Sequence, residues 1–179
     1  NFNANLQFTD PANAFNNVLL AEKEGYNFIH PFDGQYTLQG SGSLGLELHN
    51  QFTNLNKSID NVIVSVGGGG LISGLGSLIK QVYPNAKIIG IEPNKANGMT
   101  QSLKLGKPIS KVELHNSIAD SLSSPLHMPY SFSVAKQIID RMINVSDDEM
   151  IESMLFAFEN FKLALEPACV AGLSALKKY

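Results

Sequence analysis

The sequence predicts an α/β fold in which helices flank an open, twisted and mainly parallel sheet. Two apolar runs carry this prediction: the β-branched segment Val62–Val66, and the segment Lys87–Glu92, which reads KIIGIE. Continuous apolar runs of this length are typical of parallel strands that are covered on both faces. Between them, Leu71–Tyr83 has helical spacing and stops before Pro84. Strand, helix and strand in this order form a right-handed βαβ unit.

Further helices and strands are expected on either side of this unit. Asp10 followed by Pro11 is typical of a helix start, and Gly25 of a helix end. In the second half, Ser146 and Glu149 have the spacing of a capping box. We expect strands over Tyr26–Phe32 and Arg141–Val145, helices over Gly45–Phe52, Lys95–Leu105, Ser131–Asp140 and from Ser146 onward, and a loop over Leu122–Pro129.

Two sets of apolar side chains are expected to face the core. Leu44 and Leu48 would face inward from the helix that contains Gly45–Phe52. Four side chains on the helix after Ser146 recur at helical spacing, and they are expected to form core rather than cofactor contacts. They are Met150, Met154, Phe158 and Phe161.

Composition limits the classes of protein that the chain fits. Its 179 residues suit one domain with a substantial core, and its 44% hydrophobic and 16% charged residues are ordinary for a globular protein. A net charge of −3 argues against a nucleic-acid partner, and no apolar stretch is long enough to span a membrane. The single cysteine, Cys169, suits a reducing, cytoplasmic compartment. The chain begins at Asn1 without Met, so we expect a piece of a longer protein.

Four consecutive glycines, Gly67–Gly70, form a tetraglycine loop between the expected strand Val62–Val66 and the expected helix. A loop without side chains can place several backbone N–H groups against one anion, and the helix N-terminus adds positive potential. Glycine also permits close approach of the backbone and positive φ angles. A tight turn is the alternative, but one or two glycines suffice for a turn. The loop therefore predicts a phosphate-type ligand.

A second glycine pattern, Gly40–Gly45, matches the G-x-G-x-x-G sequence of dinucleotide-binding folds. Glu92 lies about 20 residues beyond the tetraglycine loop, as a ribose-binding acid would. However, the segment Tyr36–Gln39 before the pattern is too short and too polar for a first Rossmann strand. A Rossmann-type nucleotide-binding domain thus stays an alternative.

Several motifs together resemble a known family. Val66–Leu71 with Ser73 and Gly74 resembles the phosphate loop of pyridoxal-phosphate enzymes of the tryptophan-synthase β type. Three further groups of residues narrow the resemblance to the threonine/serine dehydratase and serine racemase group: His30–Asp33 with Gln39–Ser41 and Glu47, Ser117–Leu122, and Glu166–Ala168. The resemblance implies that residues 1–34 are the end of a small domain and the crossover. It also implies that residues 35–179 are an incomplete large domain that binds the phosphate.

The resemblance also implies a site for pyridoxal 5'-phosphate. Backbone amides of the tetraglycine loop would hold the phosphate, and three side chains would lie near the ring. The implied cofactor-binding residues are Gly67, Gly68, Gly69, Gly70, Leu71, Ser121, Glu166 and Phe32. From the residues alone, Asp120 and Ser121 are equally consistent with capping a turn, and Glu166 with a favourable acid at a helix start.

By the same resemblance, the activity is deamination of a small hydroxy amino acid, L-threonine or L-serine, to a 2-oxo acid and ammonia. A serine racemase of the same family and a non-catalytic oligomerisation module are alternatives. The family's Schiff-base lysine precedes the matched part and its Ser-Gly-Gly-Asn strand would follow Tyr179, so we expect the chain alone to be inactive. A homo-oligomer is also expected, because missing strands would leave sheet edges open.

No metal site is expected from the residue pattern. Some relatives bind a divalent cation through two acids and a backbone carbonyl; Glu92 and Ala96 match two of these positions, but Gly98 replaces the second acid. Cys169 is expected to be a small packed residue rather than a nucleophile. The histidines lack metal-ligand spacing, so solvated or core roles are expected of His30, His49, His115 and His127.

Overall fold

The computed structural model describes residues 3–110 and 117–179, which form two compact units, one ending at His30 and one spanning Pro31–Tyr179. The first unit contains helix α1 (Pro11–Lys23), which begins at the predicted proline. The prediction of a strand over Tyr26–Phe32 is wrong, because the structure has irregular backbone there. A strand needs ladder hydrogen bonds to a neighbouring strand, and the described sheet is built from three other segments.

The second unit is built around a parallel sheet with the strand order β1-β2-β3. The bounds of its strands are β1 (Asn61–Ser65), β2 (Lys87–Pro93) and β3 (Arg141–Val145). Ile63 of β1 pairs with Ile89, and Ile91 pairs with Ile143 of β3. Helix α3 (Gly70–Val82) connects β1 to β2. The predicted βαβ unit is therefore confirmed.

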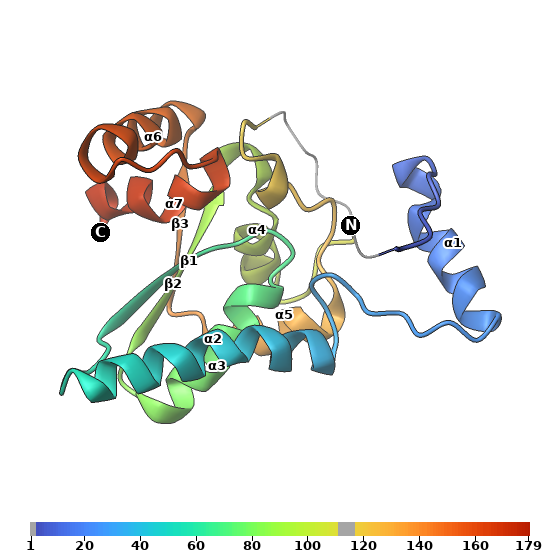
Figure 1. Cartoon of the computed structure of the whole chain (residues 1–179), viewed down its shortest axis with the longest axis horizontal. Coiled ribbons are helices and arrows are strands. Elements are labelled where there is room, and N and C mark those ends of the chain that lie inside the picture. Colours follow the sequence, from blue (N-terminus) through green and yellow to red (C-terminus); the bar gives the residue numbers. More distant parts are fainter. Residues whose placement is uncertain (1–2, 111–116) are drawn as a thin grey trace. The chain divides into compact units, whose positions relative to one another are not determined.

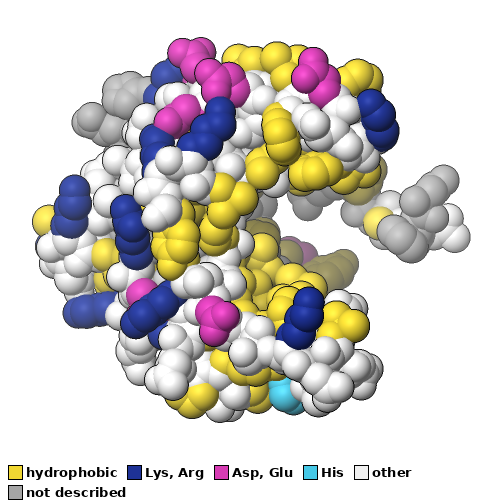
Figure 2. Space-filling view, turned by 90° about the vertical axis from the view of Figure 1, so that its left-hand side faces the viewer, with side chains coloured by type: hydrophobic (Ala, Val, Ile, Leu, Met, Phe, Trp, Pro, Cys, Tyr) yellow, Lys and Arg dark blue, Asp and Glu magenta, His cyan; other side chains and the backbone are white. Residues whose placement is uncertain are grey.

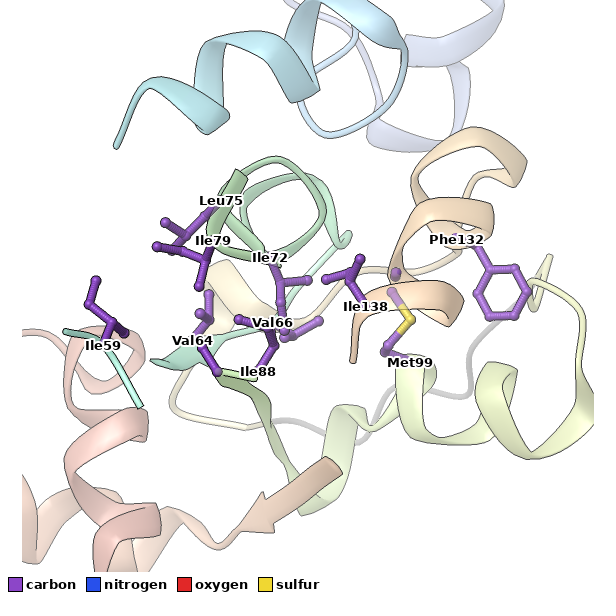
Figure 3. Close-up of a cluster of buried hydrophobic side chains, with 12 residues drawn as sticks. Ile59, Val64, Val66, Ile72, Leu75, Ile79, Ile88, Met99, Phe132 and Ile138 are labelled. Atoms are coloured by element: carbon purple, nitrogen blue, oxygen red, sulfur yellow. The ribbon is translucent and has the colours of Figure 1, made fainter. Parts of the chain in front are cut away.

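Helices cover both faces of the sheet (Figure 1). One face carries α3 and α5 (Pro129–Ile138), with α2 (Gln35–Asn54) packed on α3; the other carries α6 (Asp147–Phe161) and α7 (Pro167–Ala175). Ile88 of β2 packs with Ile72 and Ile79 of α3 (Figure 3), whereas Ile89 packs with Val170 of α7. In the part of the chain that is described, no helix is long and apolar enough to cross a membrane.

Helix α2 is longer than predicted, because it begins at Gln35. It contains the whole Gly40–Gly45 pattern, so this pattern does not form the turn after a strand that a Rossmann site requires. Glycine instead allows close packing of two helices: a Cβ on Gly74 of α3 would overlap the carbonyl oxygen of Leu38 and the side chain of Ser41. The Rossmann alternative is therefore wrong for this segment.

Two predicted helices have different bounds in the structure. The segment predicted as one helix over Lys95–Leu105 is divided into a 3-10 turn (Asn94–Ala96) and helix α4 (Gly98–Leu105). Helix α5 ends at Ile138 and does not reach Asp140. The carboxylate of Asp140 instead accepts a hydrogen bond from the backbone N–H of Ile88 (2.8 Å), which joins the end of α5 to β2.

Helix α6 begins at the predicted capping box. The Oγ of Ser146 accepts from the N–H of Glu149 (3.2 Å), whose carboxylate accepts from the N–H of Ser146 (2.7 Å). The prediction that four side chains of this helix face the core is wrong in part. Met150 is buried and Met154 is half-buried, but Phe158 and Phe161 are 61% and 55% exposed. Around the helix, Ala157 lies about 20° from Met150 and Phe158 lies about 80° away. The small Ala157 therefore faces α7.

Candidate functional site

The tetraglycine loop joins the carboxyl end of β1 to the N-terminus of α3. Gly69 has a φ of 95°, a left-handed conformation that glycine adopts without strain, and it directly precedes the helix. Its carbonyl oxygen accepts the hydrogen bond of the Ser73 N–H (3.1 Å). The buried strand and helix on either side thus fix where the loop lies.

The amide groups of the loop are available to a ligand. The N–H of Val66 donates to the carbonyl of Ile91 in the sheet (2.8 Å). In the described structure, none of the backbone N–H groups of residues 67–72 donates to a backbone carbonyl. Amides at a helix N-terminus and the helix dipole together favour an anion. This geometry fits a phosphate group.

Close packing behind the loop explains why these residues are glycines. A Cβ on Gly68 would overlap the ring of Phe32, and a Cβ on Gly70 would lie 2.8 Å from the Phe32 backbone. A Cβ on Gly67 would lie 3.1 Å from the carbonyl oxygen of Ser121. Both distances are shorter than ordinary van der Waals contacts. The loop therefore needs more glycines than a tight turn does.

The tetraglycine loop forms one wall of a cavity of about 770 Å³. The other walls come from α2, β1 and α7 and are mainly apolar, and Figure 2 shows a hollow with hydrophobic side chains around it. Leu44, predicted to face the core, lies on this wall and is 41% exposed. No lysine is among the described residues that line the cavity. All of the predicted cofactor-binding residues line it: Phe32, Gly67, Gly68, Gly69, Gly70, Leu71, Ser121 and Glu166.

Three polar side chains meet where α7 borders the cavity. The Oγ of Ser121 donates to the Oε1 of Glu166 (3.4 Å), and the Sγ of Cys169 lies 3.7 Å from the same oxygen. Cys169 is exposed, so the prediction of a packed side chain is wrong. Its neighbours Ala168 and Val170 are buried on the sheet side of the helix, which turns the thiol to the cavity. Desolvation and the Glu166 carboxylate raise the pKa of this thiol, so it stays protonated at neutral pH.

The structure places Asp120 at a turn and Glu166 at a helix start, as the alternatives for these two acids proposed. The carboxylate of Asp120 accepts from the N–H of Ser121 (2.8 Å) and so stabilises the 3-10 turn Asp120–Leu122. Glu166 is the N-cap residue of α7, directly before Pro167, so an acid does stand at this helix start; its carboxylate makes no capping hydrogen bond. The carboxylate of Glu166 therefore lies at the cavity wall, where Ser121 and Cys169 contact it.

The carboxylate of Glu92 caps helix α4. One oxygen accepts from the N–H of Met99 (2.6 Å), and the other accepts from the N–H and the Oγ of Thr100 (2.9 and 2.8 Å). Burial raises the pKa of Glu92 to about 7, although these hydrogen bonds act to lower it. Within the described residues, no group of three His, Cys, Asp or Glu side chains is arranged to hold a metal ion. His115 lies outside these residues.

One residue at the site was not predicted there. Cys169 follows Glu166 by three residues in α7, so helical spacing could have placed it on the same face. His127 is buried away from the cavity, and burial lowers the pKa of its ring, although the Gly68 backbone acts to raise it.

Comparison with known proteins identifies relatives of the chain. A family model described as pyridoxal-phosphate dependent enzyme matches residues 2–179. A phenylserine dehydratase of Ralstonia pickettii is 40% identical over 164 residues, which are 91% of this chain and 49% of that protein. An L-threonine dehydratase of Pasteurella multocida is 38% identical over 162 residues, which are 90% of this chain and 31% of that protein. The chain thus spans half or less of these relatives.

Solved structures share the fold. Maize serine racemase matches with a TM-score of 0.81 and 34% identity, over 90% of this chain and 47% of that one. The processed form of threonine deaminase isoform 2 from Solanum lycopersicum matches with a TM-score of 0.80 and 34% identity, over 88% of this chain and 44% of that one. The predicted α/β fold of the tryptophan-synthase β type is confirmed. The chain belongs to the pyridoxal-phosphate-dependent enzymes, and its cofactor is pyridoxal phosphate.

Proposed function

We propose that the tetraglycine loop holds the phosphate of the cofactor in an enzyme that deaminates L-threonine or L-serine to a 2-oxo acid and ammonia. When bound, pyridoxal phosphate withdraws electrons from the α-carbon of an amino acid, so that the α-proton becomes acidic and a β-hydroxyl can leave. The observation that carries the proposal is the set of amides of residues 67–72 that make no backbone hydrogen bond within the described structure. Dehydratases among the relatives support the reaction class.

Each part of the site has a role in this proposal. The amides of Gly67–Leu71 bind the phosphate and so fix the position of the ring. Phe32 lies against Gly68 and limits how far the loop can move back. Ser121 holds the carboxylate of Glu166 (3.4 Å), which presents an oxygen to the cavity. The apolar walls exclude water from the reacting atoms.

We also propose that residues 35–179 form the phosphate-binding domain and that residues 1–34 are the end of a smaller domain with its crossover. The residues that line the cavity support this division, because all but Pro31 and Phe32 lie after residue 35. The residue that reacts covalently with the cofactor is not among them, since no lysine is among the described lining residues.

Titration of the 179-residue chain with pyridoxal phosphate tests the proposed site. We expect saturable binding by equilibrium dialysis and a shifted phosphorus NMR signal, without the visible absorbance of a lysine-linked cofactor. Gly68→Ala would force a Cβ into Phe32 and should weaken binding roughly tenfold or more. Gly40→Ala is the matched control, because its Cβ would meet nothing within 4 Å. Equal binding by Gly68→Ala and wild type would contradict the proposed phosphate site.

Activity assays test the proposed reaction. The chain alone should release no ammonia from L-serine or L-threonine, because the cavity lacks a lysine among its described lining residues. An enzyme that contains this chain should release ammonia and a 2-oxo acid from one of these substrates. Ammonia release by the isolated chain would show that the covalent step does not need a residue outside it.

Racemisation of serine is the second candidate function. The match to maize serine racemase, with a TM-score of 0.81 at 34% identity, favours it. An enzyme that contains this chain would then convert L-serine to D-serine and form little oxo acid. Measuring both products from L-serine distinguishes the two candidates.

We further propose that the protein forms a homo-oligomer. β1 and β3 each pair with one strand in the described sheet, and Phe158 and Phe161 are exposed on α6. Open strand edges and exposed aromatic side chains favour association between copies. Sedimentation analysis over a range of concentrations should show a species heavier than 19.4 kDa; a monomer throughout would contradict this proposal.

A further inference from the structure

Asp33 is a half-buried acid that caps a helix far from it in the sequence. It stands two residues before α2, yet the N-terminus of α2 has no side-chain cap. The Oδ1 of Asp33 instead accepts from the N–H of Ser131 (2.6 Å), in the first turn of α5. Met128, which directly precedes α5, makes no capping bond of its own. Helix α5 therefore receives its cap from a residue 98 positions away in the chain.

The residue before Asp33 lies against the tetraglycine loop. A Cβ on Gly68 would overlap the ring of Phe32, and a Cβ on Gly70 would lie 2.8 Å from the Cα and the carbonyl oxygen of Phe32. Both the ring and the backbone of Phe32 thus pack closely on the loop. Because one planar peptide joins Phe32 to Asp33, a bond that fixes Asp33 also limits where Phe32 can lie.

Helix α5 is itself tied to the loop through two serines that are 0% exposed, Ser73 and Ser131. The Oγ of Ser73 in α3 donates to the carbonyl oxygen of Ser131 (2.9 Å). The N–H of Ser73 donates to the carbonyl oxygen of Gly69 (3.1 Å). A connected series of hydrogen bonds therefore runs from Asp33 through the two serines to the loop.

We propose that Asp33 is a positioning residue for the phosphate loop: by accepting from the N–H of Ser131, it holds Phe32 against the tetraglycine loop. This inference rests on the proposed phosphate site. Asp33 is not among the residues that line the cavity, so it acts through Phe32 and not by touching the ligand. Without its carboxylate, Phe32 has room to move off the loop, and the loop amides lose the support that holds them against the anion.

Affinities for inorganic phosphate and for pyridoxal phosphate test this role in the 179-residue chain. Asp33→Ala removes the acceptor, whereas Asp33→Asn keeps an oxygen at the place of Oδ1. We expect Asp33→Ala to bind both ligands roughly tenfold more weakly and Asp33→Asn to stay within about threefold of wild type. Ser146→Ala is the matched control, because it also removes a side-chain acceptor from a helix N-terminus, and Ser146 does not line the cavity. It should leave both affinities unchanged.

A double-mutant cycle tests whether Asp33 acts through Phe32. Phe32→Leu removes the ring that packs on Gly68 and should by itself weaken binding. In that background Asp33→Ala should cause a smaller loss than in wild type, because the side chain that it positions is gone. Fully additive losses, equal losses in Asp33→Asn and Asp33→Ala, or wild-type affinity in Asp33→Ala would overturn the role of Asp33 and leave the phosphate site in place.

A measurement on the wild-type chain keeps the inference testable if a variant fails to fold. NMR should show a scalar coupling between the amide nitrogen of Ser131 and the carboxyl carbon of Asp33, and nuclear Overhauser contacts between the Phe32 ring and the α-protons of Gly68. Both should persist when phosphate is bound. Absence of the coupling or of the contacts would overturn the role of Asp33. A wild-type chain that binds neither ligand would instead overturn the proposed function.

Discussion

At the scale of single residues, burial and hydrogen bonding have opposite effects on the pKa of Glu92. Glu92 is 1% exposed, and removal from water favours its neutral form. The N–H groups of Met99 and Thr100 favour the ionised form, because both donate to its oxygens. Burial has the larger effect, and it raises the pKa from 4.5 to about 7. Proton uptake by Glu92 is therefore linked to folding.

The raised pKa of Glu92 predicts a pH dependence of stability. Between pH 4.5 and about 7, the folded chain binds this proton more tightly than the unfolded chain does. The stabilisation is full below pH 4.5 and is lost as the pH rises through 7, by about 3 kcal/mol at most. Urea unfolding at pH 5 and pH 8 should measure this effect. The difference in the free energy of unfolding between wild type and Glu92→Gln should not be the same at the two pH values.

The comparison of wild type with Glu92→Gln cancels the contributions of the other titrating groups. Glu152→Gln is the matched control, because Glu152 is an exposed carboxylate paired with Lys177 (2.8 Å). It should keep the pH dependence of the wild type. If Glu92→Gln keeps it as well, the carboxylate of Glu92 is not the group that takes up the proton.

At the scale of elements, helix ends and helix contacts decide the architecture around the site. The start of α6 is defined by the reciprocal hydrogen bonds of Ser146 and Glu149. The contact of α2 with α3 depends on Gly74, where a Cβ would meet the α2 backbone at Leu38. Both features place helices against the sheet that carries the tetraglycine loop.

Removal of the α6 cap should lower the stability of the chain. Ser146→Ala leaves the N–H of Glu149 without its acceptor (3.2 Å) and should cost about 0.5–2 kcal/mol in the free energy of unfolding. Ser133→Ala is the control. The Oγ of Ser133 is exposed and donates to the carbonyl oxygen of Tyr130 within the same helix, α5 (2.7 Å). Urea unfolding measures both variants, and equal losses would contradict a specific capping role.

At the scale of the whole molecule, the cavity is assembled from distant segments of the unit Pro31–Tyr179. Phe32, Leu44 of α2, the end of β1, Ser121 and Glu166 all contribute to its walls. A ligand that contacts several of these segments binds only the folded chain. Cofactor binding is therefore expected to stabilise this unit as a whole.

Pyridoxal phosphate should raise the stability of the chain through this coupling. At one hundred times its dissociation constant, we expect about 2.7 kcal/mol in the free energy of unfolding, measured by urea denaturation. Pyridoxal without the phosphate is the matched control ligand and should stabilise the chain much less, because it offers no anion to the amides of residues 67–72. Equal stabilisation by both ligands would contradict phosphate recognition by the loop.

Local patterns in the sequence determined most of the secondary structure. The runs Val62–Val66 and Lys87–Glu92 became parallel strands, and the capping box at Ser146 started α6 as predicted. The motifs around the tetraglycine loop also named residues that lie in one cavity. These predictions succeeded because β-branched runs, glycine runs and caps act on their own few residues of backbone.

Only the tertiary structure decided the features that depend on a distant neighbour. The segment Tyr26–Phe32 forms no strand, Phe158 is exposed where Ala157 faces α7, and Cys169 faces the cavity. The burial of His127 belongs to the same class. Whether a strand pairs or a side chain is buried depends on which segments pack together, and local sequence does not encode that choice.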